Sequence, residues 1–452
     1  MDRKKPLKIS LITLGCKTNQ ADAASLAAEL AARGHEIVSS KKEADAFVIH
    51  TCTVTHKTDY QGRQAIRRAV AKNPEAKIVV TGCYAQVSPD ALRDISGVDY
   101  VVQTGERSRI PEILLTRGKE KNARLLSSPA EPVPPFIEEH LPFFADRTRA
   151  YLKVQDGCNS FCSYCLVPLA RGRNRSLPVE RAVAKVKELA SSGFQEIVLT
   201  GIHLGAYGED LSPPISLLDL LHALEAVVET RRIRLSSIEP GEFTPSLVEF
   251  LSRSKKVCAH LHVPLQSGDD GVLRRMNRGY SRAFFEDLIF RLGQAIPDLA
   301  IGADVIGGFP GEDERAFAGT CELIARLPIA YLHVFPFSKR AGTPAARFPD
   351  QVRGEVIKAR CAALRELGAE KRSDFYHSYL GKKVKVLIES KPDRQTGLLK
   401  GFSRNYIPAL IAGDEIFMNR EVDVELAEVR GDKVFGQIIS PPRAQRTQRG
   451  NY

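Results

Sequence analysis

The run CNSFCSYC places three cysteines, Cys158, Cys162 and Cys165, at the spacing C-x3-C-x2-C. Thiolates are soft ligands, and a group of them favours zinc or an iron–sulfur centre. A structural zinc ion usually takes four protein ligands, and no further cysteine or histidine follows within about a dozen residues. Three thiolates instead suit a four-iron cluster that keeps one iron open for a substrate or cofactor. We therefore predict such a cluster here, with zinc or incidental core cysteines as the alternatives.

Three more cysteines follow short apolar runs. Cys16 comes after KISLITLG, Cys52 after AFVIHT and Cys83 after KIVVTG. In a parallel sheet the carboxyl ends of all strands lie on one edge, where ligands bind. Three thiols far apart in the sequence would therefore meet in space and form a second three-cysteine site. The alternative is three separate core cysteines, because cysteine is often buried.

The elements that must position these cysteines alternate between strand and helix over residues 1–116. Short apolar runs are separated by helical stretches, and this alternation predicts a parallel α/β sheet. Residues 117–149 are charged and then proline-rich without a sustained period, which predicts a linker. The strands expected in the first segment are 8–15, 46–51, 77–82 and 100–105.

The alternation resumes over residues 150–373. Six strand–helix units predict an open or partial parallel (βα)6 barrel, with its chemistry at the C-terminal ends of the strands. A helical stretch at about 350–373 closes this segment. The strands expected here are 151–156, 196–201, 232–238, 259–265, 301–306 and 331–337.

Residues 374–440 change to period-two alternation with glycine turns, which predicts a small antiparallel β-barrel domain. The basic tail 441–452 is expected to be disordered. The predicted fold class is therefore α/β, with an N-terminal parallel sheet, a central partial barrel and a C-terminal β-barrel. The strands expected in the last domain are 381–390, 397–411, 420–431 and 433–439.

The charge balance and the cysteine count set the broad class. A net charge of +11 in 452 residues favours a polyanionic partner, with nucleic acid first, although a basic soluble surface is the alternative. Nine cysteines are an odd number, and thiols stay reduced in the cytosol, so a disulfide framework is not expected. The start MDRKKPLKISLITLGC is similar to a lipoprotein signal, but Lys8 interrupts its short apolar run. We expect a cytoplasmic protein with no membrane contact, because no apolar run reaches membrane-spanning length.

Longer motifs carry a family resemblance. The C-x3-C-x2-C run after the first strand of a six-unit barrel resembles the radical S-adenosylmethionine (SAM) superfamily. The stretches LGCKTNQAD, HTCTVTHKTDYQGRQAIRRA and VVTGCYAQ resemble the amino-terminal domain of methylthiotransferases. VQDGCNSFCSYCLVPLARGRNRS, HLHVPLQSGDDGVLRRMNRGY and ADVIGGFPGE continue that resemblance, and the last domain is similar to the RNA-binding TRAM domain. The resemblance covers essentially the whole chain in order.

The resemblance implies an enzyme with two [4Fe-4S] clusters and SAM as cofactors. The 158–165 run would hold the cluster that chelates SAM, whose cleavage gives a 5′-deoxyadenosyl radical. That radical would remove a hydrogen atom from an unactivated carbon. Cys16, Cys52 and Cys83 would hold an auxiliary cluster that carries the sulfur to be methylated and transferred.

The other strand ends of the barrel are then implied to hold SAM. LTGIHLG and VIGGFPGE put glycines there, where the backbone must approach a ligand closely, and SSIEP and HVPLQSG add polar groups. The alternative is that these turns serve only the geometry of the barrel. Acid–base catalytic residues are not identified. The expected SAM-binding residues are Thr200, Gly201, Ser237, Glu239, Gln266, Asp304 and Gly307.

Three branches of the family differ in substrate. Two modify the adenosine 3′ of a tRNA anticodon, which bears an isopentenyl or a threonylcarbamoyl group, and the third modifies an aspartate of a ribosomal protein. HTCTVTHKTDYQGRQAIRRA with TGCYAQ is most similar to the threonylcarbamoyl branch, which implies methylthiolation at C2 of N6-threonylcarbamoyladenosine. The implied partners are the anticodon stem-loop of tRNA, an electron donor protein and a sulfur source. An alternative of another class is a non-catalytic RNA-binding protein with structural zinc.

Basic and aromatic residues predict an RNA path. ARGRNR and RRMNRGYSR offer arginines near the cluster, among them Arg171, Arg175 and Arg278. The alternative for each arginine is a solvated surface charge or an internal ion pair. In the β domain KGFSRNYIP interleaves both residue types, and its expected RNA-binding residues are Lys400, Phe402, Arg404 and Tyr406.

Four more side chains have expected places. His260 and His262 alternate within a strand, so we expect them to face opposite sides and to be structural rather than metal ligands. His203 follows a barrel strand and is a further site candidate. Asn19 is expected to cap the helix that follows Cys16, and the alternative is a hydrogen bond to a cluster sulfur or to a substrate.

Overall fold

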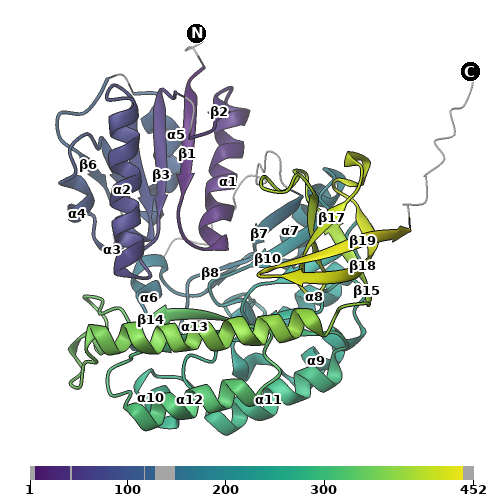
Figure 1. The fold of residues 1–452 in the computed structure, drawn as a ribbon. Helices are drawn as coiled ribbons and strands as arrows, with labels where there is room; N and C mark the ends of the chain where they lie inside the picture. The colour runs from purple at the N-terminus through teal and green to yellow at the C-terminus, as the bar shows by residue number, and fades with distance from the viewer. Residues whose placement is uncertain (1–5, 41–42, 117, 128–147, 441–452) are drawn as a thin grey trace, which may run out of the picture.

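The computed structural model describes residues 6–40, 43–116, 118–127 and 148–440. It contains an N-terminal α/β unit, a central open barrel of parallel strands and a C-terminal β-barrel, with the long helix α13 (Gly354–His377) leading into the last. Figure 1 shows the N-terminal unit over one end of α13 and the small barrel at the other end. The tail 441–452 lies outside the described residues. None of the helices in the described ranges combines the length and apolarity of a transmembrane span.

The N-terminal unit is a parallel sheet of six strands in the order β2-β1-β3-β4-β5-β6, which confirms the predicted parallel sheet. The two edge strands β2 and β6 were not predicted, because each is short and, unlike the equally short β5, is not an all-apolar, fully buried run. β6 lies inside the predicted linker, so that prediction is wrong there, and residues 128–147 lie outside the described part. The strands are β1 (Lys8–Thr13), β2 (Glu36–Val38), β3 (Ala46–Thr51), β4 (Lys77–Gly82), β5 (Tyr100–Val102) and β6 (Arg124–Leu126).

The central strands of this sheet are apolar because both of their faces are covered. Every residue of β3 and β4 is buried, as expected for the middle of a parallel sheet with helices on both sides. The helical elements of this unit are α1 (Lys17–Ala32), α2 (His56–Lys72), α3 (Cys83–Val87), α4 (Asp90–Arg93), η1 (Thr104–Arg109) and α5 (Ile110–Leu114).

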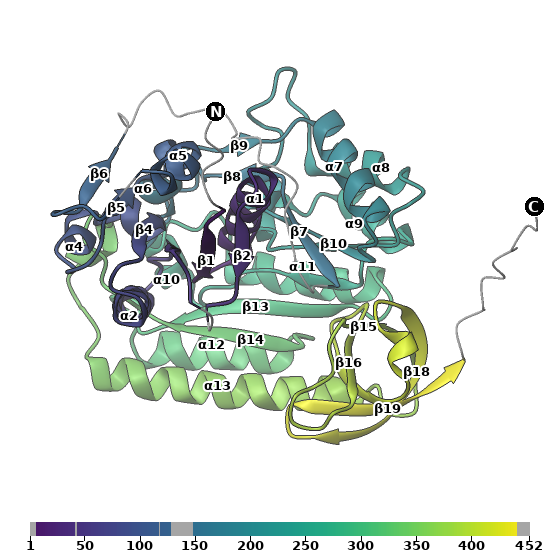
Figure 2. The ribbon, with the colours of Figure 1, turned by 90° about the horizontal axis from the view of Figure 1, so that it is seen from above.

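The central unit has the six predicted parallel strands. They form two three-stranded sheets, β11-β10-β7 and β12-β13-β14, and a parallel bridge between Ile233 and Val257 continues the barrel from one to the other. The N-terminal unit lies over the C-terminal strand ends of this barrel (Figure 2), where Thr18 meets Thr200 at 3.4 Å. The strands are β7 (Arg149–Lys153), β10 (Glu196–Thr200), β11 (Arg232–Leu235), β12 (His260–His262), β13 (Ala300–Gly307) and β14 (Tyr331–Pro336).

Helices alternate with these strands as the sequence predicts. A two-stranded antiparallel pair, β8 (Gln155–Asp156) and β9 (Arg175–Ser176), flanks the loop that carries the cysteine run. The remaining helices are α6 (Val167–Arg171), α7 (Val179–Ser191), α8 (Leu217–Glu225), α9 (Pro245–Arg253), α10 (Asp270–Arg275), α11 (Arg282–Ala295) and α12 (Glu314–Arg326), with short turns η2 (Leu204–Ala206), η3 (Pro240–Glu242) and η4 (Pro344–Arg347).

The C-terminal domain is a closed barrel of five strands in the order β15-β16-β17-β19-β18. The predicted small β-barrel is confirmed, but the pairing of β17 with β19 is parallel rather than antiparallel. The single predicted run 397–411 is two strands, because the chain turns at Tyr406, whose φ is +66°. The elements are β15 (Lys383–Ile388), β16 (Leu399–Ser403), β17 (Pro408–Ala412), η5 (Glu415–Phe417), β18 (Glu421–Arg430) and β19 (Lys433–Ser440).

A buried ionic cluster fastens the C-terminal barrel to the central unit. Arg232 and Arg234 on β11 both pair with Glu196 on β10, at 2.7 and 2.8 Å. The same two guanidinium groups donate hydrogen bonds to the main-chain oxygen of Ser403, and Arg234 also donates to that of Arg404. Burial alone would raise the pKa of Glu196, but the two arginines lower it to about 2. The carboxylate is therefore ionised and organises both guanidinium groups.

We expect Glu196→Ala to destabilise the protein by about 3–5 kcal/mol, because it leaves two buried cations without their carboxylate. Glu249→Ala is the matched control, since it removes one carboxylate from an exposed i,i+4 pair with Arg253 and should cost at most about 1 kcal/mol. Differential scanning calorimetry of both variants measures the effect. Equal unfolding temperatures for the two variants would contradict the structural role of Glu196.

Candidate active site

The first cysteine trio, Cys16, Cys52 and Cys83, lies at the carboxyl ends of the neighbouring strands β1, β3 and β4. Cys16 precedes α1, Cys52 directly follows β3, and Cys83 begins α3. The predicted convergence is therefore present in the structure. Three thiols from distant parts of the sequence share one edge of the sheet.

Two glycines allow this close approach. Gly15 has a φ of +101°, and a Cβ atom there would lie 2.6 Å from the Cβ and 2.9 Å from the Sγ of Cys52. Gly82 has a φ of +97°, and a Cβ atom there would overlap the main-chain oxygen of Thr51. The glycine before Cys16 and the glycine before Cys83 thus both pack against the end of β3.

The environment of this trio fits a bound metal cluster. Burial raises the pKa of Cys52 to about 12, and the nearby Cys83 and Cys16 add to the shift. Burial also raises the pKa of Cys83. Thiols of this kind stay protonated until a metal centre takes them as thiolates, and metal binding then releases the protons. Three soft donors from three strand ends are the donor set of an iron–sulfur cluster with an open iron.

The second trio, Cys158, Cys162 and Cys165, occupies the loop between β8 and α6. Burial raises the pKa of Cys165 to about 12, with contributions from the other two thiols. Main-chain N–H groups of Ser160 and Val167 donate to Cys158 and Cys165, each at 3.4 Å. Donors aimed at sulfur are typical of cysteines that ligate a cluster. This trio therefore also fits a four-iron centre.

Two side chains from other loops reach this second trio. Arg278 donates to the Sγ of Cys162 at 3.3 Å and is also bonded to Glu239. The Nδ1 of His203 lies 3.5 Å from the Sγ of Cys158, and its Nε2 lies 2.5 Å from Glu242. The structure thus places the predicted site candidate His203 beside the cysteine run. It gives Arg278 an internal contact, where the sequence suggested an RNA path.

One cavity of about 180 Å³ is lined by residues from the loops that carry both trios and from the barrel strand ends. On one side it is lined by Val54 and Thr55, which follow Cys52, and on the other by Tyr164, which lies between Cys162 and Cys165. The floor is formed by strand ends of the barrel, and the remaining lining residues are Gln266, Asp304, Ile306, Phe335, Pro336, Phe337 and Ser338. A molecule bound here would contact residues close in sequence to one cysteine of the first trio and two of the second.

The residues predicted to bind SAM fall in different places. Gln266, whose φ is +64°, and Asp304 line the cavity. Gly307 packs against α13 instead, where a Cβ atom would lie 3.0 Å from the Sγ of Cys361. SAM binding by these residues stays a prediction.

The remaining predicted SAM-binding residues lie at two other strand ends. Thr200 is buried against Thr18 of the N-terminal unit, and Gly201 packs against Gln155. Ser237 is half-buried after β11, and Glu239 is held by Arg278. Glu239 therefore stands close to the second trio, and its role toward SAM also stays a prediction.

The inner face of β12, β13 and β14 carries a polar cluster that the sequence did not indicate. His260 and His262 both contact the hydroxyl of Tyr331, at 2.7 and 3.3 Å, so the expectation that they face opposite sides is wrong. Residues two apart in a strand point to the same face. His262 and His333 both pair with Asp304, at 2.8 and 3.3 Å. These three groups are close enough to share a metal ion, but they already satisfy one another.

The predicted RNA patch lies at the junction between the C-terminal barrel and the central unit. The guanidinium of Arg149 stands 4.6 Å from the ring centre of Phe402, and Tyr406 packs against Arg234 at 4.8 Å. Arg404 donates to the main-chain oxygen of Lys255 and pairs with Glu421. Lys400 is half-exposed at the rim. Three of the four residues thus pack between domains, and their contact with RNA stays a prediction.

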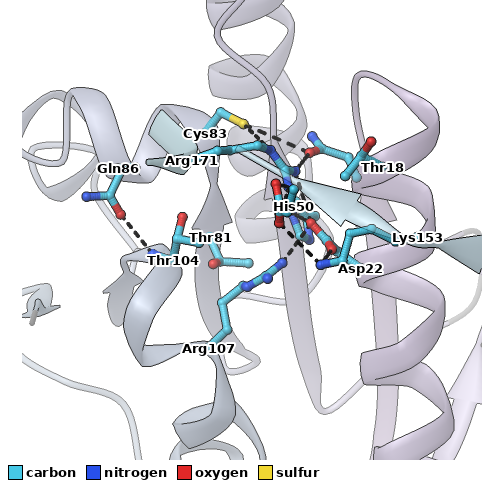
Figure 3. Close-up of polar contacts among 12 residues, drawn as sticks. Thr18, Asp22, His50, Thr81, Cys83, Gln86, Thr104, Arg107, Lys153 and Arg171 are labelled. Atoms are coloured by element: carbon cyan, nitrogen blue, oxygen red, sulfur yellow. Dashed lines mark hydrogen bonds and ion pairs between the residues drawn. The ribbon is translucent and has the colours of Figure 1, made fainter. Parts of the chain in front are cut away.

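A network of buried charges joins the two cysteine-bearing units around Asp22 of α1 (Figure 3). Its carboxylate pairs with Arg107 at 2.7 Å, Lys153 at 2.5 Å and Arg171 at 2.9 Å. Burial alone would raise the pKa of Asp22, but these three cations hold it well below its usual range. Lys153 and Arg171 belong to the central unit, so the carboxylate binds across the domain boundary.

Two sequence expectations are wrong in this region. Arg171 and Arg175 are 4% and 8% exposed, so they are internal rather than on an RNA path. Asn19 does not cap α1. Its Nδ2 donates to the main-chain oxygens of Leu14 and Thr51 at 2.7 and 3.1 Å, and it thereby ties the ends of β1 and β3 together.

Comparison with known proteins identifies the family. The model of uncharacterized protein family UPF0004 matches residues 8–103, and that of the Radical SAM superfamily matches residues 152–324. Threonylcarbamoyladenosine tRNA methylthiotransferase MtaB of Bacillus subtilis (strain 168) is 40% identical over 434 residues, which cover 95% of this chain and 96% of that protein. The chain belongs to the radical SAM methylthiotransferases, in the MtaB branch. It is an enzyme, a transferase, whose family works with SAM and a [4Fe-4S] cluster.

More distant proteins share the sequence pattern or the fold of this chain. A tRNA-2-methylthio-N(6)-dimethylallyladenosine synthase of Moorella thermoacetica is 33% identical to this chain. The match covers 96% of this chain and 99% of the synthase. The solved structure of TsrM, a radical SAM methyltransferase from Kitasatospora setae, has a TM-score of 0.54 at 14% identity and covers 75% of this chain and 77% of its own. The latter shows a shared fold.

We expect Gly15→Ala to displace Cys52 and to lower the iron bound after anaerobic reconstitution by about half, which is the loss of one four-iron cluster of two. Gly34→Ala is the matched control, because Gly34 has a similar φ of +88° but nothing within 4 Å of the added methyl. Both variants are destabilised by about 1 kcal/mol, because alanine is strained at a positive φ. Iron content per chain measures the difference, and equal iron in the two variants would contradict the packing argument.

Proposed function

We propose that this enzyme adds a methylthio group to C2 of N6-threonylcarbamoyladenosine, the nucleoside 3′ of the anticodon in tRNA. The observation that carries the proposal is the presence of two cysteine trios whose loops line one cavity. Inserting sulfur at an inert C–H bond needs a radical generator and a separate sulfur donor, and two cluster sites meet both needs.

The comparisons support the choice of substrate. Relatives named threonylcarbamoyladenosine tRNA methylthiotransferase in Bacillus subtilis and Thermotoga maritima are 40% and 34% identical and cover 95% of this chain. The net charge of +11 suits a nucleic acid partner. The C-terminal domain is a closed five-stranded barrel, and its sequence is similar to the RNA-binding TRAM domain.

The protein's own residues would divide the work between the two sites. The 158–165 trio would hold the [4Fe-4S] cluster that binds SAM, and Cys16, Cys52 and Cys83 would hold a second one. When bound, these groups supply a 5′-deoxyadenosyl radical at one site and a transferable sulfur at the other. Arg278 and His203 orient the second trio, Cys158, Cys162 and Cys165, through their sulfur contacts.

The cavity lining would orient the cofactor and the substrate. Gln266 and Asp304 present an amide and a carboxylate toward the space beside Tyr164, where they would hold polar parts of SAM. Thr200, Gly201, Ser237 and Glu239 remain proposed SAM contacts through their strand-end positions. Phe335 and Phe337 make the opposite wall apolar and help to exclude water from a radical site.

The proposed partners follow from the same chemistry. Reductive cleavage of SAM requires an electron donor protein, and sulfur that is used up must be replaced from a sulfur source. The anticodon stem-loop is the proposed RNA ligand, with Lys400 at the rim of the domain junction, where its side chain is more exposed than that of Arg404.

We expect Cys16→Ala to bind about half as much iron as the wild type while it still forms 5′-deoxyadenosine from SAM, because it removes only the sulfur-donor site. Cys158→Ala should lose a similar share of iron and all SAM cleavage. Cys321→Ala, on α12 outside both trios, is the control and should keep both properties. Iron analysis and quantification of 5′-deoxyadenosine measure these outcomes. Full iron in Cys16→Ala, or zinc in place of iron, would contradict the two-cluster assignment.

We expect tRNA from a deletion strain to lack the methylthio group on N6-threonylcarbamoyladenosine, and plasmid-borne wild type, but not Cys16→Ala or Cys158→Ala, to restore it. Nucleoside mass spectrometry measures the modified base directly. Loss of the methylthio group from the dimethylallyl nucleoside instead would assign the enzyme to that substrate. Unchanged tRNA would remove tRNA as the substrate and favour a protein aspartate.

A further inference from the structure

We propose that Arg171 is a positioning residue that reaches from the radical SAM unit to the sulfur of Cys83 and raises the reduction potential of the auxiliary cluster. The inference rests on the proposed function, since it needs the second cluster. It assigns to the central unit a direct influence on the sulfur-donor site of the other unit.

The hydrogen bond to sulfur crosses the domain boundary. Arg171 is the last residue of α6, six positions after Cys165, and its Nε donates to the Sγ of Cys83 at 3.4 Å. Figure 3 shows this side chain extended beneath Cys83, beside the groups of α1. Arg171 is 4% exposed, so water competes little for this donor.

The rest of the guanidinium group is fixed from both units. Its Nη1 donates to both carboxylate oxygens of Asp156 at 3.0 and 3.1 Å. Its Nη2 donates to Asp22 at 2.9 Å and to Asn19 at 2.5 Å. Asp156 comes two residues before Cys158, and Asn19 comes three residues after Cys16. These bonds set the plane of the guanidinium and aim its remaining N–H at Cys83.

The chemistry of such a contact has a defined direction. A hydrogen bond and a positive charge at a cysteine sulfur stabilise the reduced cluster, which carries one more negative charge, and therefore raise its potential. The planar fork of arginine supplies five donors in fixed directions, whereas the ammonium of lysine is a compact point charge. Lysine at position 171 would keep the charge but lose the directed N–H contact with sulfur.

The test isolates the auxiliary cluster in the full-length chain. A parent variant with Cys158, Cys162 and Cys165 all changed to alanine retains only the first trio, and its potential is measured by a redox titration followed by electron paramagnetic resonance. We expect Arg171→Met in this parent to lower the reduced-to-oxidised ratio at a fixed potential about tenfold, which is about 59 mV for one electron. Arg171→Lys should lower it less.

Arg107→Lys in the same parent is the matched control, because it also replaces an arginine bonded to Asp22 and keeps that cation. It should leave the potential unchanged. An unchanged potential in both Arg171 variants, or an equal shift in Arg107→Lys, would overturn the role of Arg171. A parent variant that binds no iron would overturn the second cluster itself, and with it the proposed function.

A second measurement detects the contact with sulfur directly, in the parent itself as well as in the variants. In the parent labelled with [15N]arginine, the reduced cluster should show a hyperfine coupling to a guanidinium nitrogen, since Nε lies 3.4 Å from a ligating sulfur. The coupling should disappear in Arg171→Lys and persist in Arg107→Lys. Its absence from a parent that holds four irons would overturn the inference.

Discussion

The buried carboxylate of Asp22 is the contact on which the arrangement of the two cysteine sites depends. Each ion that leaves water costs several kcal/mol, and only close, well-directed partners recover that cost. Arg107 comes from its own unit, while Lys153 and Arg171 come from the other. If one unit slid over the other, Asp22 would lose Lys153 and Arg171 and would keep Arg107 as the remaining one of these three cations. The network therefore favours one docked position, and that position sets the distance between the trios.

A second charged contact between the two units comes from the loop after β14. Arg340 of the central unit pairs with Asp59 at 2.7 Å and donates to Thr53, the residue after Cys52, at 2.6 Å. Arg340 and Arg171 thus reach the N-terminal unit close to two different cysteines of its trio. Both arginines are buried. Their guanidinium groups hold the sheet edge that carries the first trio against the barrel.

Sequence reasoning succeeded where the signal was local and failed where the partner lay in another unit. The apolar runs before Cys16, Cys52 and Cys83 gave strands whose ends had to share an edge, and the structure has that edge. Arg171 and Tyr406 looked like surface groups because no local pattern marks a residue that docks on a different domain. Asn19 looked like a helix cap for the same reason, since its acceptor at Thr51 is remote in the chain. The opposite faces expected for His260 and His262 came from misapplying the strand period.

The geometry also bears on how a substrate reaches the chemistry. A cavity of about 180 Å³ that opens to the surface suits a single unstacked base better than a base pair. Unpaired bases in a loop leave their stack at a lower free-energy cost than paired bases. An anticodon loop could therefore place a base in the cavity more easily than a duplex could. The C-terminal barrel is itself locked to the central unit through Glu196, Arg232 and Arg234. The position of the C-terminal barrel relative to the cavity is therefore fixed. An RNA bound to this barrel would place its loop at a set distance from both trios.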